Sequence, residues 1–100
     1  MKNKKKIIDW ADSKGLLIQS NHKNQLIKLY EEAGELSSAI LKNNDDEIVD
    51  AIGDIGVVMI ILSNQLGYDF EKCIDNAYNV IKDRTGKNIN GTFIKDEKTI

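Results

Sequence analysis

Three carboxylates crowd into the stretch EEAGEL, where Glu31, Glu32 and Glu35 fall within five residues. At about 100° per residue, an α-helix would place these three acids together on one side. Taken alone, this arrangement is typical of a solvent-exposed face, because the opposite side of the same helix is apolar. The residues that form this apolar side are Leu26, Leu29, Tyr30, Ala33, Ile40 and Leu41.

A second set of acids follows on the next predicted helix and changes this interpretation. Glu47, Asp50 and Asp54 have the spacing i, i+3, i+7, which places them on one helical face. The same face continues as valine and isoleucine between residues 57 and 61, and the opposite side is also apolar. A helix that is apolar nearly all round must be covered on both sides. We therefore expect these carboxylates to point into a packed interior or a cleft.

Carboxylates in such a place must become neutral, pair with a cationic side chain or bind a cation. All six acids offer oxygen ligands, whereas the single histidine, His22, lies more than two helical turns before Glu31, and Cys73 is alone. Oxygen ligands favour hard cations, Mg²⁺ or Mn²⁺, over zinc. Because Mg²⁺ usually keeps positions for water and substrate phosphates, the pattern indicates phosphate transfer or phosphate hydrolysis.

The chain contains no proline, and glycine and asparagine mark its turns. Asn21 is a candidate N-cap, Gly15 and Gly67 follow helix ends, and Asn90-Gly91 is typical of a two-residue hairpin turn in the tail. The sequence predicts an all-α fold, an antiparallel helical bundle of about four helices with a short C-terminal hairpin-like tail. We expect the helices over about residues 4–14, 22–42, 45–66 and 69–84.

The apolar third helix also predicts that oligomerisation completes the core. Four short helices of one chain can scarcely cover both of its sides. We expect a homodimer or a dimer of dimers, with the site near the subunit interface. The residues expected in the shared core are Val57, Val58, Met59 and Ile61.

Length and composition restrict the class of protein. One hundred residues, 41% of them hydrophobic and 30% charged, predict a single globular domain over residues 1–100. The formal net charge of -2 argues against general nucleic-acid binding. The longest apolar run, Val57 to Leu62, is far below the roughly 20 residues that a membrane-spanning helix needs. With one lone cysteine, the sequence predicts a cytoplasmic protein without nucleic-acid or membrane partners.

The two acidic stretches resemble the signature of the MazG-like members of the all-α nucleoside triphosphate pyrophosphohydrolases. That signature is similar to Glu-Glu-x-x-Glu, a spacer and Glu-x-x-Asp, matched here by Glu31–Glu35 and Glu47–Asp50. The resemblance runs from about Gln25 to Leu66. Asp54 could equally be the metal-binding aspartate of the family, and in that register the expected glutamate falls on Ala51. The register stays open between these two alignments.

The resemblance implies Mg²⁺-dependent hydrolysis of a nucleoside triphosphate, NTP or dNTP, at the α–β phosphoanhydride. The products would be a nucleoside monophosphate and pyrophosphate. In this scheme Glu31 or Glu47 is the catalytic residue that orients and deprotonates the attacking water. The expected ligands for Mg²⁺ are Glu32, Glu35, Asp50 and Asp54.

Basic and amide side chains complete the predicted site. Lys28 either pairs with Glu32 or contacts the nucleotide substrate. Trp10 could stack on a base, but its place beside Ile7 and Ile8 favours the core. Cations near a helix end are also favourable without a ligand, and the resemblance favours phosphate contacts there. These predicted contacts are Asn79, Lys82 and Arg84.

Two other functions remain open at this point. The chain could be a non-catalytic helical interaction module that keeps the fold with a degenerate acidic site, which the mismatch at Ala51 allows. It could also be a hydrolase of the same class that acts on another phosphoanhydride or on a diphosphate. The sequence contains nothing that identifies the base or the sugar.

Overall fold

The chain forms two compact units, residues 1–70 and 71–100. The computed structural model describes residues 1–18 and 21–96. The prediction of a single domain over residues 1–100 stays a prediction, and each unit is described by itself. The described residues form four α-helices and one two-stranded antiparallel sheet, which confirms the predicted all-α fold with a hairpin tail.

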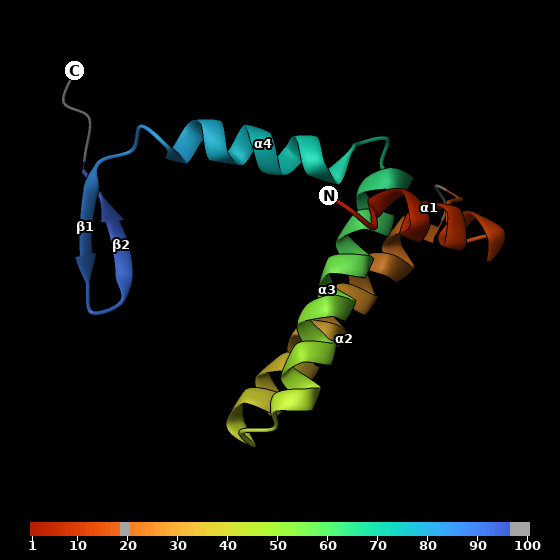
Figure 1. Ribbon diagram of the computed structural model, residues 1–100, viewed down its shortest axis with the longest axis horizontal. Helices are drawn as coiled ribbons and strands as arrows, with labels where there is room; N and C mark the ends of the chain where they lie inside the picture. The colour runs from red at the N-terminus through yellow and green to blue at the C-terminus, as the bar shows by residue number, and fades with distance from the viewer. Residues whose placement is uncertain (19–20, 97–100) are drawn as a thin grey trace. The chain divides into compact units, whose positions relative to one another are not determined.

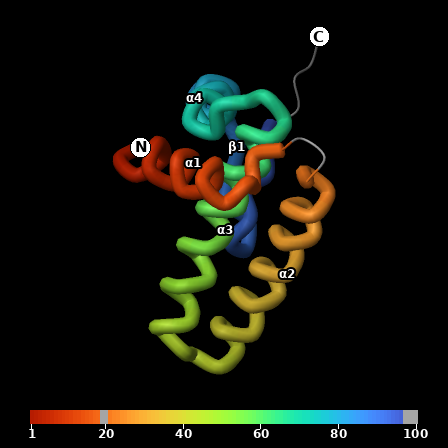
Figure 2. The backbone as a smooth tube through the Cα atoms, turned by 90° about the vertical axis from the view of Figure 1, so that its right-hand side faces the viewer, coloured from red at the N-terminus to blue at the C-terminus, as the bar shows by residue number. Residues whose placement is uncertain are grey.

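Two long antiparallel helices dominate the first unit, α2 (His22–Leu41) and α3 (Asp45–Gln65). The shorter α1 (Lys4–Ser13) packs across the C-terminal half of α3 (Figures 1 and 2). Two side-chain contacts join the two ends of the α1 region to the C-terminal end of the α3 region: Lys4 Nζ lies 2.8 Å from Asp69 Oδ1, and Gln65 Nε2 donates a hydrogen bond to the Leu16 carbonyl. α1 and α2 therefore both pack against α3.

Two asparagines precede the long helices, and only one acts as a side-chain cap. Asn44 has an extended backbone (φ -94, ψ 100), and its Oδ1 accepts a hydrogen bond from the Glu47 N–H at 3.1 Å. Asn21 makes no side-chain cap hydrogen bond, which corrects the prediction for that residue. Its backbone is already helical (φ -91, ψ -1), whereas an N-cap side chain reaches the helix from an extended backbone.

The second unit contains most of α4 (Phe70–Ile81) and a hairpin of β1 (Gly86–Ile89) and β2 (Thr92–Lys95). Asn90 and Gly91 both have positive φ, 52° and 86°, as a two-residue type I′ turn requires. The predicted hairpin is thus confirmed. α4 ends earlier than the predicted Arg84, because the chain must leave the helix before β1 begins at Gly86.

The buried side of α2 differs from the predicted one. Glu32 and Ala39 are the buried residues of this helix, and Gln25, Leu29 and Leu36 on the same stripe are half-buried. This stripe lies about a quarter of a turn from the predicted apolar side. Most of the residues expected to be buried are therefore exposed: Leu26, Tyr30, Ala33, Ile40 and Leu41.

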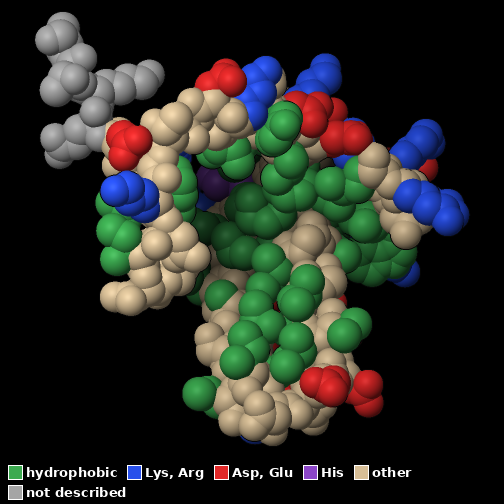
Figure 3. Space-filling model, turned by 60° about the vertical axis from the view of Figure 1, so that its left-hand side comes forward, with side chains coloured by type: hydrophobic (Ala, Val, Ile, Leu, Met, Phe, Trp, Pro, Cys, Tyr) green, Lys and Arg blue, Asp and Glu red, His purple; other side chains and the backbone are tan. Residues whose placement is uncertain are grey.

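The core of the first unit lies mainly on α3. Val58 and Ile61, predicted to join a shared core between subunits, are 5% and 3% exposed within their own chain, and the shared core stays a prediction. Hydrophobic side chains also gather on the surface of the α2–α3 pair (Figure 3). Among the described residues, no helix is long and apolar enough to cross a membrane. The remaining core residues are Ala11, Ala39, Ala51, Ile60 and Leu62.

Candidate functional site

Glu32 and Asp54 face each other where the antiparallel helices α2 and α3 meet. Glu32 is 4% exposed, although a glutamate is rarely buried without a partner. Asp54 is half-buried on the stripe of α3 that also contains Ala51 and Val58. Glu32 of the EEAGEL stretch thus points into the structure, whereas Asp50, one of the acids expected to point into an interior or a cleft, is exposed.

Two further carboxylates adjoin this pair. The pKa of Glu35 is raised, first by a hydrogen bond with the Glu32 carboxyl and then by the Glu32 charge, with a smaller contribution from Asp54. The pKa of Asp54 is raised by desolvation, and next by the charges of Asp50 and Glu32. Both shifts have the direction expected when carboxylates share a site. The four acids Glu32, Glu35, Asp50 and Asp54 therefore form one electrostatic cluster, called here the acidic cluster.

Lys28 partly balances this negative charge. Its Nζ lies 3.4 Å from Glu32 Oε1, one helical turn away, and the pKa of Lys28 is raised by its hydrogen bond and charge interaction with Glu32. The second oxygen, Glu32 Oε2, is buried and has no hydrogen-bond donor among the described residues. The neighbouring carboxyls can bond to it only when one of them holds a proton. A buried anionic oxygen without a donor or a cation is unfavourable.

Two hollows open beside the acidic cluster. One, of about 290 Å³, contains Glu32 and Asp54 and is named here the Gln25 hollow. The other, of about 340 Å³, contains Glu35 and Asp50 and is named the Glu47 hollow. The Gln25 hollow is completed by Trp10, Leu16, Gln25, Lys28, Val57, Val58 and Ile61, and the Glu47 hollow by Ser38, Lys42, Glu47 and Ala51.

The two candidate catalytic residues occupy different places. Glu47 is exposed, lies in the first turn of α3 and lines its hollow beside Asp50. Glu31 is exposed and lines neither hollow, although its charge acts on Lys28. The structure thus places Glu47 in one hollow with Glu35 and Asp50 of the acidic cluster, whereas Glu31 lines neither hollow.

The predicted phosphate contacts divide between the two units. Lys28 lies in the first unit and pairs with Glu32. Asn79 lies on α4, and Lys82 and Arg84 lie in the turn before β1, all in the second unit and all exposed. Their role as substrate contacts stays a prediction.

The acidic cluster suits a hard divalent cation in its chemistry, because every donor is a carboxylate oxygen and one buried oxygen lacks a partner. Among the described residues, however, no group of three or more histidine, cysteine, aspartate or glutamate side chains is arranged to hold a metal ion. A complete protein cage is not required for Mg²⁺, which is commonly bound by one or two carboxylates together with substrate phosphates. The residues therefore fit a cation that binds with its substrate.

Two residues of the Gln25 hollow were not among the predicted site residues. Gln25 Oε1 is buried without a partner, and Trp10, expected in the core, is 51% exposed at the edge of the hollow. The available signal for Gln25 is its spacing, since it lies seven residues, or two helical turns, before Glu32 on the same stripe. Trp10 comes from a separate helix, and the sequence raised its stacking on a base but favoured the core.

Comparisons with known proteins identify the family of this chain. The uncharacterized 18.2 kDa protein in the rep-hol intergenic region of Haemophilus phage HP1 (strain HP1c1) is 49% identical over 61 residues. These residues are 61% of this chain and 37% of the phage protein, so the chain matches little more than a third of that relative's length. No solved structure matches the chain. The sequence profile of the MazG-like family matches residues 23–92, which include both acidic stretches, and the chain therefore belongs to the MazG-like family.

Proposed function

We propose that this protein hydrolyses a nucleoside triphosphate, NTP or dNTP, at the α–β phosphoanhydride to a nucleoside monophosphate and pyrophosphate in a Mg²⁺-dependent reaction. Membership of the MazG-like family suggests a nucleotide pyrophosphohydrolase-type role. The observation that carries the proposal is the buried Glu32, whose Oε2 has no donor among the described residues and which faces Asp54 across the helix pair. This oxygen is available to a cation without first breaking a protein hydrogen bond.

One or two carboxylates of the acidic cluster, which comprises Glu32, Glu35, Asp50 and Asp54, would hold Mg²⁺, or Mn²⁺ in its place, together with substrate phosphates. When bound, the cation would supply positive charge to the phosphate oxygens as negative charge builds on the leaving pyrophosphate. Without a cation, the four carboxylates outnumber the nearby ammonium groups of Lys28 and Lys42 and would repel a polyanionic substrate. Activity should therefore be lost entirely when the divalent cation is removed.

The side chains around the Glu47 hollow would act on the attacking water. We propose that Glu47 accepts a proton from this water, because it lines the hollow with Glu35 and Asp50. Glu31 is the second candidate and would act through Lys28, whose pKa it helps to raise. Glu47→Gln and Glu31→Gln separate the two, since the base should lose kcat with little change in KM.

We also propose that the substrate's outer phosphates contact Asn79, Lys82 and Arg84. The resemblance to the family supports this role. The positive charges of Lys82 and Arg84 and the exposure of all three side chains support it too, because a cation or an amide can donate a hydrogen bond to a phosphate oxygen. Arg84→Ala should raise KM and leave kcat nearly unchanged. An unchanged KM would remove Arg84 from the substrate site.

Product analysis tests the proposed reaction. The purified chain would be incubated with a panel of NTPs and dNTPs in Mg²⁺, in Mn²⁺ and in EDTA, and the products would be separated. Monophosphate and pyrophosphate in equal amounts, formed only with the cation, would support the proposal. Diphosphate with inorganic phosphate would contradict it, because that pair arises from cleavage at the β–γ bond.

One observation favours a second function, a non-catalytic helical interaction module. Ala51 is 4% exposed and occupies the position where one of the two family registers expects a glutamate. A site that lacks this acid could retain the fold without turnover. Nucleotide binding without hydrolysis by the parent chain, together with unchanged binding by Glu35→Gln, would favour the module.

A further inference from the structure

The Gln25 hollow has two chemically different ends. Glu32, Lys28 and Asp54 make one end charged, whereas Trp10, Leu16 and Ile61 contribute apolar surface. At about 290 Å³, the hollow is at the lower limit of small-molecule sites, which span roughly 300–1,000 Å³. It is therefore suited to one ring system, and the charged remainder of a larger ligand would extend out of it.

Gln25 provides an unsatisfied polar atom in this hollow. Its Oε1 is buried and has no hydrogen-bond partner among the described residues. An orphaned amide oxygen destabilises the free protein and needs an N–H or O–H donor. Every common nucleobase carries at least one N–H or amino group on its edge, so a base can supply this donor. Water is the competing occupant, and the experiment below separates the two.

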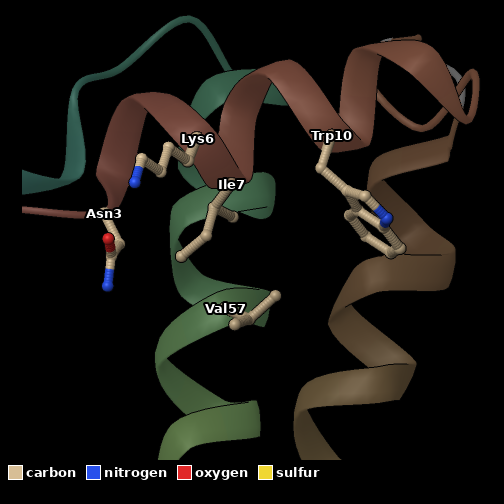
Figure 4. Close-up of a pocket in the computed structure, with 5 residues that line it drawn as sticks. All are labelled: Asn3, Lys6, Ile7, Trp10 and Val57. Atoms are coloured by element: carbon tan, nitrogen blue, oxygen red, sulfur yellow. The ribbon is translucent and has the colours of Figure 1, made fainter.

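Trp10 provides an aromatic surface at the same place. It is 51% exposed and lines both the Gln25 hollow and a neighbouring apolar hollow of about 440 Å³, with Val57 common to both. Figure 4 shows the Trp10 side chain extending from α1 beside Val57 toward α2. A half-exposed indole is a suitable stacking surface, because base–aromatic stacking uses the π-face that all bases share. Lys6, Ile7 and Asn3 complete the neighbouring hollow.

We propose that Trp10 and Gln25 form the base-binding subsite of this protein, with Trp10 stacking on a nucleobase and Gln25 Oε1 accepting a hydrogen bond from its edge. This inference rests on the proposed nucleotide hydrolysis and adds the orientation of the substrate. Gln25 and Glu32 are seven residues apart on one helical face, which corresponds to about 10 Å along the axis. The sugar would lie between them, and the phosphates would lie at the acidic cluster.

The chain contains a single tryptophan, so its fluorescence reports directly on this subsite. Nucleosides without phosphates, and α,β-methylene nucleoside triphosphates with Mg²⁺, would be titrated into the full chain. We expect a saturable change in Trp10 fluorescence with both ligands, and a lower affinity for the nucleosides. An unchanged spectrum at nucleotide concentrations that saturate hydrolysis would overturn the proposal.

Variants separate recognition from folding. Trp10→Phe should keep part of the stacking surface, whereas Trp10→Ala should raise KM about tenfold with a much smaller change in kcat, within the range for one lost base–aromatic stack. Gln25→Leu should raise KM and also raise the melting temperature, because it removes the orphaned oxygen. Ser37→Ala, at an exposed position of α2, is the matched control and should leave both quantities unchanged.

The outcomes distinguish this inference from the proposed reaction. A fluorescence change with nucleosides in a chain that hydrolyses no nucleotide would support the subsite and contradict the reaction. Hydrolysis with normal KM in both Trp10→Ala and Gln25→Leu would support the reaction and overturn the subsite. A lower melting temperature with normal KM in Gln25→Leu would show that the amide binds a structural water instead.

Discussion

Each of the two faces of α2 carries residues that are unusual for a surface helix. The face toward α3 contains Gln25 and Glu32, with two buried oxygens that lack partners among the described residues. The outward face exposes large apolar side chains, with Tyr30 at 72% and Leu41 at 84%. A surface helix normally buries its apolar stripe and exposes its charges. We propose that the buried face serves a ligand and that the outward face serves a protein contact.

The largest expected effect comes from a substitution on the buried face of α2. Glu32→Gln keeps the size of the side chain and removes its charge, so it should reduce kcat on the order of 100-fold or more, as for the loss of one preorganised electrostatic contact. Steady-state hydrolysis measures this loss. Folding should be preserved, and circular dichroism provides the check. Equal rates for Glu32→Gln and the Ser37→Ala control would show that the buried face is not the site.

The second largest effect is expected from a substitution on the outward face of α2. We propose that this face binds a second copy of the chain, as a homodimer or within a dimer of dimers. Tyr30→Glu places a charge among Leu26, Ile27 and other exposed apolar residues. Loss of one buried aromatic contact costs about 1.5–3 kcal/mol, so the dimer should weaken at least tenfold. Sedimentation velocity measures the assembly, and a stable monomer of the parent at micromolar concentration would contradict the proposal.

A substitution in the turn between α2 and α3 should have a smaller effect, which should fall on the stability of the whole fold. Asn44→Ala removes the side-chain acceptor for the Glu47 N–H and should lower the free energy of unfolding by about 1 kcal/mol. Urea denaturation measures this loss. The variant should reduce global stability without abolishing hydrolysis, in contrast to Glu32→Gln. A complete loss of activity in a folded Asn44→Ala chain would mean that the cap itself positions Glu47.

The smallest expected effect is a pH dependence of stability in the absence of divalent cations. The raised pKa values of Asp54 and Glu35 mean that the folded state binds protons more tightly than the unfolded state. Stability should therefore fall as pH rises from the ordinary carboxyl values, 3.8 and 4.5, through the raised ones. Solvent screening keeps this loss small. Melting temperatures from pH 4 to 8 measure it, and Asp54→Asn should flatten the profile, whereas an identical slope would contradict the assignment.

Local signals predicted the elements of the fold well. The helix start at Asp45 and the Asn90-Gly91 turn follow from capping and turn chemistry, which depend on a few neighbouring residues. The buried side of α2 could not be predicted in the same way. Apolar content alone favoured the side of Leu26 and Tyr30, whereas the structure packs the stripe of Glu32 against Asp54.

Only part of the candidate site could be predicted from the sequence, because helical periodicity is a local signal and the packing of the helices is not. Periodicity placed Asp50 and Asp54 on one face, and their electrostatic interaction agrees with that placement. Trp10 and Gln25 could not be assigned to the site, because their juxtaposition depends on how α1 crosses α3 and how α2 is rotated. The register of the second acidic stretch stays open: Asp54 interacts with Glu32, and Glu47 lines the neighbouring hollow.

The most direct test of the contrast between the two faces is equilibrium binding of an α,β-methylene nucleoside triphosphate, measured by titration calorimetry in Mg²⁺ and in EDTA. The account predicts saturable binding by the parent chain only with Mg²⁺, and the same affinity for Ser37→Ala. Glu32→Gln should bind at least tenfold more weakly, which corresponds to about 1.4 kcal/mol. Cation-independent binding, or equal affinities of the parent and Glu32→Gln, would contradict the assignment of the buried face of α2 as the nucleotide site.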